Sequence, residues 1–333
     1  MAITQPDLKF YHSLEVSDAA TNGGGIDQSN EVVTGIKNNV WPNVSADERA
    51  AGSDHYRKIH CTPESNTDDQ LVDPRAWNHA PTPGDDYIYM FAGTKTDTEA
   101  TINESRKYGC GQLKTNVLAG VSTITVVVEN AALTGIFMAS DKIRISNQVL
   151  PNSLGDFQEL ALTSTPPLVS GLGVTLYLAE PLAAYYQAYN TVVSSMWYPG
   201  TTECDIGTVT RTSASGVTNE STVAPILNNA GTTDEILTFT WSTAADYTVV
   251  GSLSGALPAG DVSLDYTAVN PHTGKNIITL PAGFFTGTWA ALDEVEIPVI
   301  GNNFAFWLRR VVPAGTTTLA ADENVSAFLG ESA

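Results

Sequence analysis

The final third of the chain alternates short runs of β-branched and aromatic residues with turn signals, and this pattern restricts the fold more than any other sequence feature. Pro-Ala-Gly triplets, which favour turns, begin at Pro258, Pro281 and Pro313. Between such turns we predict six strands, at residues 235–241, 247–252, 261–266, 275–281, 293–299 and 304–312. Short strands at intervals of about 8–15 residues are typical of an immunoglobulin-like β-sandwich. No Cys…Trp…Cys spacing marks a true immunoglobulin domain, so we predict the sandwich architecture alone.

The rest of the chain divides into two regions. Residues 111–205 hold further strand patterns, and residues 141–146 alternate basic with isoleucine side chains. Residues 1–110 are irregular, with short helices predicted at 29–38 and after a capping box that begins at Ser45. We therefore predict a mainly β chain with three parts: an irregular α+β N-terminal region (1–110), a β-rich middle domain (111–205) and a C-terminal immunoglobulin-like sandwich with its connector (206–333).

The composition favours a folded β protein with charge-poor surfaces. Only 16% of the residues are charged, whereas soluble domains average about 25%. The hydrophobic share of 42% is too high for a disordered chain. Because interface cores are depleted in charge, this composition suits β surfaces that meet other protein surfaces.

The charge balance argues against partners that carry many phosphates. Acidic residues number 36 and basic residues 16, which gives a net charge of -20. Nucleic acids and anionic membranes attract clustered lysine and arginine, so we expect neither as a partner. No apolar run approaches the ~20 residues that span a bilayer, so we expect no membrane insertion. The start of the chain lacks the features of a signal peptide, and the cysteines lie far apart (Cys61, Cys110 and Cys204). We therefore expect reduced thiols in a protein made inside the cell.

The sequence contains no motif of an established catalytic or cofactor site. It lacks G-x-S-x-G, H-E-x-x-H, the phosphate-binding P-loop and a dinucleotide-binding glycine motif. His55, His60 and Cys61 come closest to a metal cluster. On a strand, positions 55 and 60 point to opposite faces, so the two histidines would not share a metal. We predict no catalytic residue, no cofactor and no metal site.

Two pairs of acidic residues have an ordinary structural explanation, and the chain also contains one basic cluster. Asp68-Asp69 and Asp85-Asp86 fall in turn-like segments outside any calcium-loop register. We expect them to cap turns, with an ion at an assembly interface as the alternative. Lys95, Arg106, Lys107 and Lys114 make a mild basic cluster.

Four residues are candidates for subunit contacts. Arg309 and Arg310 follow an apolar run, and on a strand they point to opposite faces. The arginine on the buried face either pairs with an acid such as Glu294 or Glu296, or anchors a neighbouring subunit. Trp41 and Trp77 stand in polar surroundings that resemble loops, where tryptophan is more often a contact residue. The interface candidates are therefore Trp41, Trp77, Arg309 and Arg310.

Segments at both ends of the chain resemble a group of virion structural proteins of tailed bacteriophages. The segments are Asp7-Leu-Lys-Phe-Tyr, Asp18…Thr21-Asn-Gly-Gly, Ile36-Lys-Asn-Asn-Val-Trp-Pro-Asn-Val, Glu48-Arg-Ala-Ala-Gly-Ser-Asp-His-Tyr-Arg-Lys, Thr82-Pro-Gly-Asp-Asp…Phe91-Ala-Gly-Thr, Ile278-Thr-Leu-Pro-Ala-Gly-Phe-Phe-Thr-Gly-Thr-Trp and Arg309-Arg-Val-Val-Pro-Ala-Gly-Thr. The resemblance implies a subunit of a symmetric assembly in the tail or baseplate, with a head-decoration or neck position as the alternative. It implies a protein of the virion that is made in the host cytoplasm, with copies of itself and other virion proteins as partners.

Three function classes follow from these observations. The first is a structural virion subunit that holds its neighbours through charge-poor β surfaces. The second is a receptor-recognition tail protein that binds the host surface through its C-terminal sandwich. The third is a tail-associated hydrolase, for which the sequence offers no acid/base motif. The first predicts that a chain lacking residues 1–110 stays folded but no longer joins particles.

Overall fold

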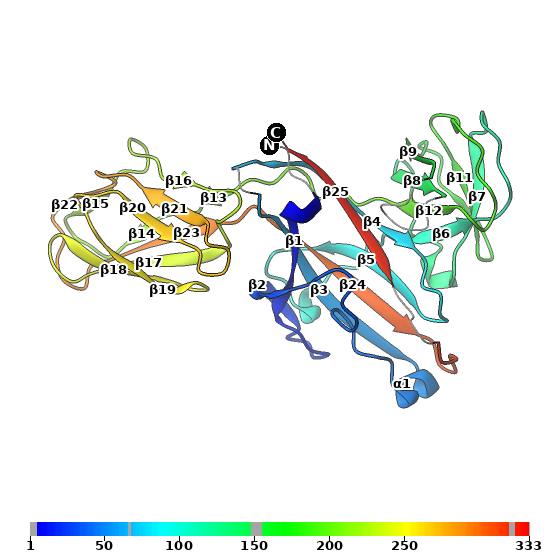
Figure 1. Cartoon of the computed structure of the whole chain (residues 1–333), viewed down its shortest axis with the longest axis horizontal. Coiled ribbons are helices and arrows are strands. Elements are labelled where there is room, and N and C mark those ends of the chain that lie inside the picture. Colours follow the sequence, from blue (N-terminus) through cyan, green and yellow to red (C-terminus); the bar gives the residue numbers. More distant parts are fainter. Residues whose placement is uncertain (1–4, 66–67, 148–154, 320–323, 333) are drawn as a thin grey trace.

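The computed structural model describes residues 5–65, 68–147, 155–319 and 324–332, and it confirms a mainly β chain. Strands hold 47% of the residues and helices 4%. The strands form a central body with one body on either side of it (Figure 1). Among the described residues, no helix is long and apolar enough to cross a membrane.

The central body is an antiparallel five-stranded sheet in the order β2-β1-β3-β24-β5. Its strands are β1 (Leu8–Glu15), β2 (Gly23–Glu31), β3 (Ser53–Pro63), β5 (Tyr87–Gly93) and β24 (Phe304–Val312). The last of these comes from the far end of the chain and lies between β3 and β5, with Trp307 opposite Lys58 on one side and Phe91 on the other. An inner strand has neighbours on both edges and layers on both faces, which explains why almost every side chain of β24 is buried.

This position of β24 corrects the sequence prediction that made residues 304–312 the sixth strand of the C-terminal sandwich. Removing residues 1–110 would take both neighbouring strands away from β24, so the expectation that this truncated chain stays folded is wrong. The irregular α+β description of 1–110 is also wrong in its main feature, because these residues supply four of the five strands of a regular sheet. Residues 29–31 end a strand and do not begin a helix.

The one predicted helix that does form among the described residues is α1 (Ala46–Ala51). Ser45 accepts a hydrogen bond from the Glu48 amide, and the Glu48 side chain bonds back to the Ser45 amide, which completes the capping box. The helix ends at Gly52, whose φ of 83° suits glycine. Single 3₁₀ turns lie at η1 (Gln5–Asp7), η2 (Glu99–Thr101) and η3 (Ala131–Leu133).

A two-stranded ribbon covers one face of the central sheet (Figure 1). It pairs β4 (Leu71–Ala80) with β25 (Val325–Ser332), so here too the end of the chain returns to the N-terminal region. Phe328 packs against Phe10 and Phe306, with ring centroids 4.6 and 5.0 Å away. The ribbon thereby shields the core between itself and the sheet from water.

The middle body is a seven-stranded sheet in the order β10-β11-β7-β6-β12-β8-β9. Its strands are β6 (Cys110–Leu113), β7 (Thr123–Val127), β8 (Lys142–Ser146), β9 (Phe157–Ala161), β10 (Leu168–Ser170), β11 (Gly173–Tyr177) and β12 (Val192–Ser195). Its apolar side chains share one core cluster with Tyr89, Phe91 and Trp307 of the central sheet. The middle body is therefore packed onto the second face of that sheet.

The C-terminal body spans residues 205–300 and contains three sheets. The largest has the order β13-β23-β17-β18-β19, with β14 also on β23; the others are β16-β21-β20 and β15-β22. The bounds are β13 (Asp205–Ile206), β14 (Thr210–Arg211), β15 (Gly216–Thr218), β16 (Ile226–Leu227), β17 (Glu235–Trp241), β18 (Asp246–Gly251), β19 (Gly255–Asp261), β20 (Tyr266–Val269), β21 (Asn276–Leu280), β22 (Phe285–Gly287) and β23 (Glu294–Ile300). Alternate side chains of these sheets meet in one core. Four of the predicted strands are present, but 261–266 is not a strand, because residues 262–265 form the turn between β19 and β20.

Polar contacts join the C-terminal body to the central one. Lys95 Nζ lies 2.9 Å from Asp234 Oδ1 and donates to the Gly301 carbonyl at 2.6 Å. Asn270 Nδ2 donates to Gln28 Oε1 of β2 at 2.7 Å. These contacts define the inner end of the C-terminal body, and its opposite end points away from the central sheet (Figure 1).

Candidate functional site

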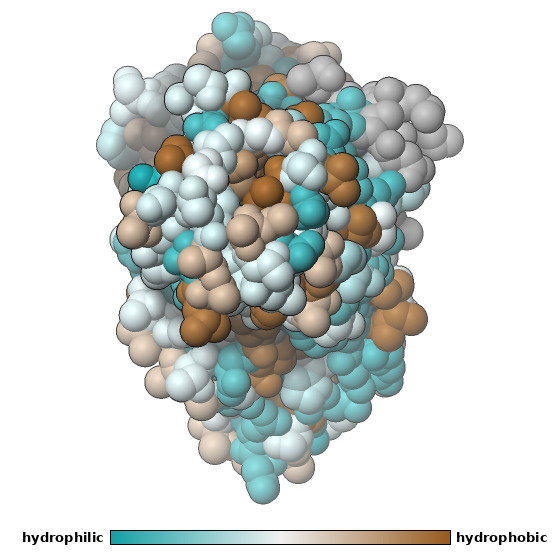
Figure 2. Space-filling model, turned by 90° about the vertical axis from the view of Figure 1, so that its left-hand side faces the viewer, coloured by the Kyte–Doolittle hydropathy of each residue, from teal (hydrophilic) through white to brown (hydrophobic). Residues whose placement is uncertain are grey.

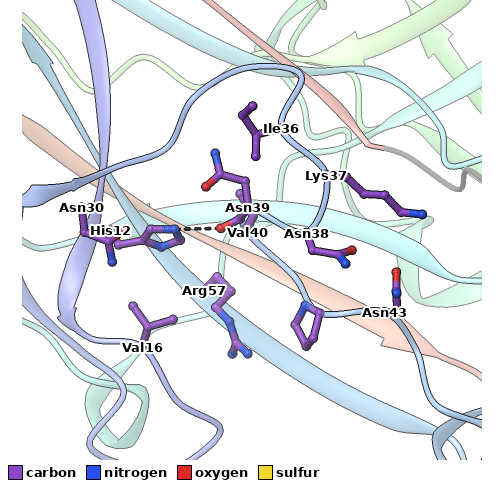
Figure 3. Close-up of a pocket in the computed structure, with 11 residues that line it drawn as sticks. His12, Val16, Asn30, Ile36, Lys37, Asn38, Asn39, Val40, Asn43 and Arg57 are labelled. Carbon is purple, nitrogen blue, oxygen red and sulfur yellow. Dashed lines mark hydrogen bonds between the residues drawn. The ribbon is translucent and has the colours of Figure 1, made fainter.

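A surface hollow of about 530 Å³ lies on the central body, between the end of β1, the loop that follows β2, and β3. Its lining residues are His12, Val16, Asn30, Ile36, Lys37, Asn38, Asn39, Val40, Pro42, Asn43 and Arg57. Figure 3 shows that the loop residues face His12 and Val16 across the hollow, with Arg57 between them. A volume of this size is within the range of small-ligand binding sites.

The lining is unusual for so acidic a chain, because none of the described lining residues is acidic. No other described residue bonds to the side chains of Lys37, Asn30, Asn38 or Asn43. Ile36 is 60% exposed at the rim, and Val16 is exposed as well. The hollow therefore offers an ammonium group, carboxamides that can both donate and accept, and an apolar rim.

Two buried side chains form the floor of the hollow. His12 Nε2 lies 2.9 Å from the Asn39 carbonyl, and burial lowers the pKa of His12. The ring is then neutral at pH 7 and donates through Nε2, which fixes the loop to β1. Arg57 Nη1 donates to Asp18 Oδ1 at 2.7 Å and to the Ser17 carbonyl at 2.9 Å. These bonds hold the floor in place and leave Lys37 as the unpaired lining cation.

Trp41 and Arg310, two of the four predicted interface residues, come together beside this hollow. The Arg57 and Arg310 guanidinium carbons lie 5.4 and 5.1 Å from the centre of the Trp41 ring. Arg310 is 5% exposed and donates to the Pro42 carbonyl at 3.0 Å. Both residues therefore hold the loop against the sheet, and their part in a subunit contact stays a prediction.

Arg309 and Arg310 do point to opposite faces, but the expected acid partners are wrong. Glu294 and Glu296 lie on β23 of the C-terminal body, whereas Arg310 contacts the loop described above. Arg309 lies 2.9 Å from both Asp54 Oδ2 and Glu104 Oε2. A strand position predicts the face on which a side chain lies, but not which distant segment covers that face.

Arg309 belongs to a network around Glu104 on the opposite face from Trp41. Tyr56 and Tyr89 donate to the Glu104 carboxylate at 2.6 and 2.8 Å, and Arg309 Nη1 donates to Tyr89 Oη at 2.7 Å. Burial alone would raise the pKa of Glu104, but these hydrogen bonds and the Arg309 charge lower it below its usual range. The network fixes the segment after β5 on the sheet.

Trp77 lies on strand β4 and is 4% exposed, which corrects the prediction of a loop position. The Arg144 guanidinium carbon lies 4.9 Å from its ring centre, and its indole nitrogen is 3.4 Å from His79 Nδ1. Trp77 therefore connects the β4–β25 ribbon with the middle body. Its predicted part in a subunit contact would need a rearrangement that uncovers the ring.

The acidic pairs and most of the basic cluster act within the chain. Asp68 Oδ1 accepts from the Asn229 amide at 2.6 Å. Asp85 Oδ2 accepts from the Thr317 amide and hydroxyl at 3.1 and 2.8 Å.

In the basic cluster, Lys95 pairs with Asp234, as described above, and Arg106 Nη2 lies 2.6 Å from Asp141 Oδ2. These residues join segments that are far apart in sequence.

His55 and His60 lie on opposite faces of β3, as their odd spacing predicts. His55 Nδ1 is 3.1 Å from Asp18 and its Nε2 is 2.7 Å from Glu48, which connects α1 to the sheet. His60 is fully buried on the other face. Within the ranges that the structure describes, no group of three or more His, Cys, Asp or Glu side chains could hold a metal ion.

The buried His60 makes the stability of the central body dependent on pH. Burial, with a smaller contribution from the Lys58 charge, lowers the pKa of His60 to about 4, against about 6.5 in an unfolded chain. Between these values the unfolded chain binds a proton that the folded chain does not, so stability falls as the pH falls from about 6.5 to about 4. We expect His60 to account for a loss of about 3 kcal/mol over this range.

Urea unfolding of the wild type and of His60→Gln at pH values from about 7 to about 4 measures this effect. The variant lacks the titrating group, so its stability should fall less steeply while the carboxylates contribute equally to both proteins. Parallel pH profiles of the two proteins would contradict the assignment.

Sequence reasoning missed the hollow and the buried pair of Lys58 and Asp97. The segment 35–44 contains three asparagines and a lysine but no acidic residue, in a chain where acids outnumber bases more than twofold. The absence of acidic residues from this segment was the sequence signal that could have indicated the hollow. Nothing in the local sequence indicated that Lys58 would be buried.

Comparison with known proteins adds no relative: no family model matches the chain, and no curated protein matches it.

Proposed function

We propose that the chain is a structural subunit of a tailed-phage virion, located in the tail or baseplate, and that it acts through contacts between subunits in a symmetric assembly. The supporting observation is a set of large apolar side chains that the fold holds exposed on rigid loops. Leu292, which lies just before β23, is 82% exposed, and Leu264, which lies just after β19, is 65% exposed. Exposed apolar groups on rigid supports suit partner surfaces.

The arrangement of the three bodies supports the same function. The two outer bodies extend from opposite sides of a central sheet that uses both ends of the chain (Figure 1). Each outer body thus presents its own loops, and the central body adds the asparagine-lined hollow. Figure 2 looks onto the outer end of the C-terminal body, where brown apolar side chains lie among polar ones. A subunit that meets several neighbours needs such separate surfaces.

We also propose that the C-terminal body is the immunoglobulin-like sandwich expected from the sequence, within the narrower bounds of 205–300. Side chains from β17 and β23 face those of β20 and β21 across a single core, with Phe239 and Tyr266 rings 5.5 Å apart. Two antiparallel sheets that face each other in this way are the defining feature of a β-sandwich.

Locating the chain in its particle tests the proposed function. Gold-labelled antibodies raised against the purified chain should mark one fixed level of the tail or baseplate in purified virions, in a copy number set by the ring symmetry. Label on the head surface or at the neck would instead support a decoration or neck position. Infectious particles that lack the chain would contradict the proposal.

Receptor recognition is the second candidate, because sandwich loops at the outer end of the C-terminal body are free to meet a host surface. If the chain binds the receptor, the purified full chain should compete with phage for adsorption to host cells. Adsorption that is unchanged at saturating protein would argue against this function.

A further inference from the structure

The outer end of the C-terminal body is formed by five loops whose position follows from the strand directions. β17 leaves the inner end near Asp234, and β23 returns to it at Gly301. The loops that connect strands at the opposite end are therefore 212–215, 242–245, 262–265, 281–284 and 288–293. We call these five loops, together with the adjoining strand residues Asp246 and Asp261, the tip.

The tip presents Leu292 on a rigid turn. Leu292 has a φ of 72°, which is unfavourable for a leucine, and its amide donates to the Trp241 carbonyl at 2.8 Å. Asp293 Oδ2 accepts from the Ala290 amide at 3.0 Å and from Ser213 Oγ at 2.5 Å. The stacked rings of Trp241 and Trp289, 3.9 Å apart, support the turn from below. The fold thus maintains a strained conformation that exposes an apolar side chain, and such strain is frequent at functional positions.

The tip is acidic as well as apolar. Asp246, Asp261 and Asp265 surround the exposed Leu264, and all four line one shallow depression. The five loops, all of them described, contain no lysine or arginine. Such a surface repels phosphates and other anions, and it attracts a surface that has cations, apolar groups and few acids.

The hollow on the central body has those properties. It holds the unpaired Lys37 above Arg57, its rim exposes Ile36 and Val16, and none of its described lining residues is acidic. Its asparagine carboxamides can bond to the exposed backbone of a loop, because each both donates and accepts. The two surfaces are therefore complementary in charge and in apolar character.

We propose that the tip of one copy of this chain docks into the asparagine-lined hollow of a second copy. This contact deepens the proposed function, on which it rests, by naming the partner as the chain itself. Within one copy the contact cannot form, because the inner end of the C-terminal body is joined to the central body and the tip points away from it.

The proposed contact is heterologous, since it joins two different surfaces. Each copy keeps a free tip at one end of the assembly and a free hollow at the other, so repetition produces a ring or an open filament. A two-fold dimer would instead use the same patch twice. Blocking the tip in one copy and the hollow in another therefore distinguishes a heterologous contact from a two-fold dimer.

The test uses the full chain with a charge placed in either surface. Leu292→Asp disables the tip, and aspartate tolerates the left-handed conformation better than leucine does. Ile36→Asp disables the apolar rim of the hollow. Sedimentation velocity should show concentration-dependent self-association of the wild type, weakened about tenfold or more in each variant alone. Raising salt from about 50 to about 500 mM should weaken the wild-type association further.

Mixing the two variants provides the decisive measurement. Leu292→Asp retains an intact hollow and Ile36→Asp retains an intact tip, so an equimolar mixture should form a one-to-one dimer and nothing larger. The matched control is Leu118→Asp, which places a charge at a leucine that is similarly exposed (66%) on the middle body and should associate like the wild type. Circular dichroism verifies that each variant is folded.

Each contrary result overturns the proposal. If the wild type stays monomeric at all concentrations, the tip does not bind a second copy of the chain, and its partner is another molecule such as a host receptor. Variants that associate like the wild type place the contact elsewhere, and a mixture that forms no dimer shows that the two surfaces do not meet. Antibody labelling of particles tests the virion role separately. The chain can therefore be found in the tail even if its tip does not bind the hollow of a second copy.

Discussion

Replacing Trp307 by alanine should lower the free energy of unfolding by about 3–5 kcal/mol, the usual cost of truncating a fully buried aromatic side chain. Trp307 is at the centre of β24 and stacks on Phe91 at 6.4 Å with an interplanar angle of 7°. Its indole nitrogen donates to Asp97 Oδ2 at 3.0 Å. Gly23 lies so close that a Cβ there would come within 2.8 Å of the ring. Alanine would leave a cavity where two bodies share their core, and urea unfolding followed by circular dichroism measures the loss.

Two variants separate the packing contribution from other effects. Trp307→Phe keeps an aromatic ring but loses the indole hydrogen bond, and we expect a loss of about 1–3 kcal/mol. Leu292→Ala removes an exposed side chain and should change stability by no more than about 0.5 kcal/mol. If Trp307→Ala cost as little as Leu292→Ala, the packing of β24 between β3 and β5 would be wrong.

Replacing Asp97 by alanine should have an effect of similar size, about 3–5 kcal/mol, because it leaves a buried ammonium group without its counter-charge. The Lys58 side chain is completely buried and its Nζ lies 2.7 Å from Asp97 Oδ1. It also donates to the Gly24 carbonyl at 2.7 Å. Burial already lowers the pKa of Lys58, and Asp97 acts against that shift. Urea unfolding at neutral pH measures the loss.

The double variant Lys58→Met/Asp97→Ala removes both charges and should recover part of this loss, since an apolar pair avoids the cost of burying ions. Asp54→Ala is the matched surface control. Its carboxylate lies 2.9 Å from Arg309 but is 45% exposed, so we expect a loss below about 1 kcal/mol. Equal losses for Asp97→Ala and Asp54→Ala would contradict the buried position of Lys58.

Much of the strand content was predictable from the sequence, because it depends on local patterns. The alternation in Glu235–Trp241 and the capping box at Ser45 both gave the observed elements. The segment 261–266 alternates too, but Asp261 accepts from the Ser263 amide at 2.7 Å and so forms a turn. A side-chain-to-backbone bond of this kind competes with strand pairing, and periodicity does not reveal it.

The pairing of β24 could not be predicted in the same way. Consecutive strands pair with each other in about two-thirds of cases, so the sequence assigned Phe304–Val312 to the sandwich that precedes it. Its partners Lys58 and Phe91 are more than two hundred residues away. The run Phe304–Leu308 predicted a strand, and the structure shows that this strand is an inner one with almost every side chain buried. The local pattern predicts the strand, whereas its partners depend on contacts distant in sequence.

The candidate site, too, could be predicted from the sequence only in part. The sequence predicts Trp41 and Arg310 as contact residues, and the structure places the Arg310 guanidinium carbon 5.1 Å from the centre of the Trp41 ring. This prediction did not identify the lining of the hollow, because Lys37 and its neighbouring asparagines are ordinary loop residues individually. They become notable only when the loop is folded over Arg57, next to Val16 and His12.

The return of the chain end to the central sheet has a consequence for synthesis on the ribosome. β3 ends at Pro63 and β24 begins at Phe304. At 5–20 residues per second, roughly 12–50 s separate the translation of the two strands. During that interval the middle and C-terminal bodies can fold, while β3 and β5 have unpaired edges that expose them to aggregation. A chain that terminates before Phe304 therefore lacks the strand that pairs with both β3 and β5 in the central sheet.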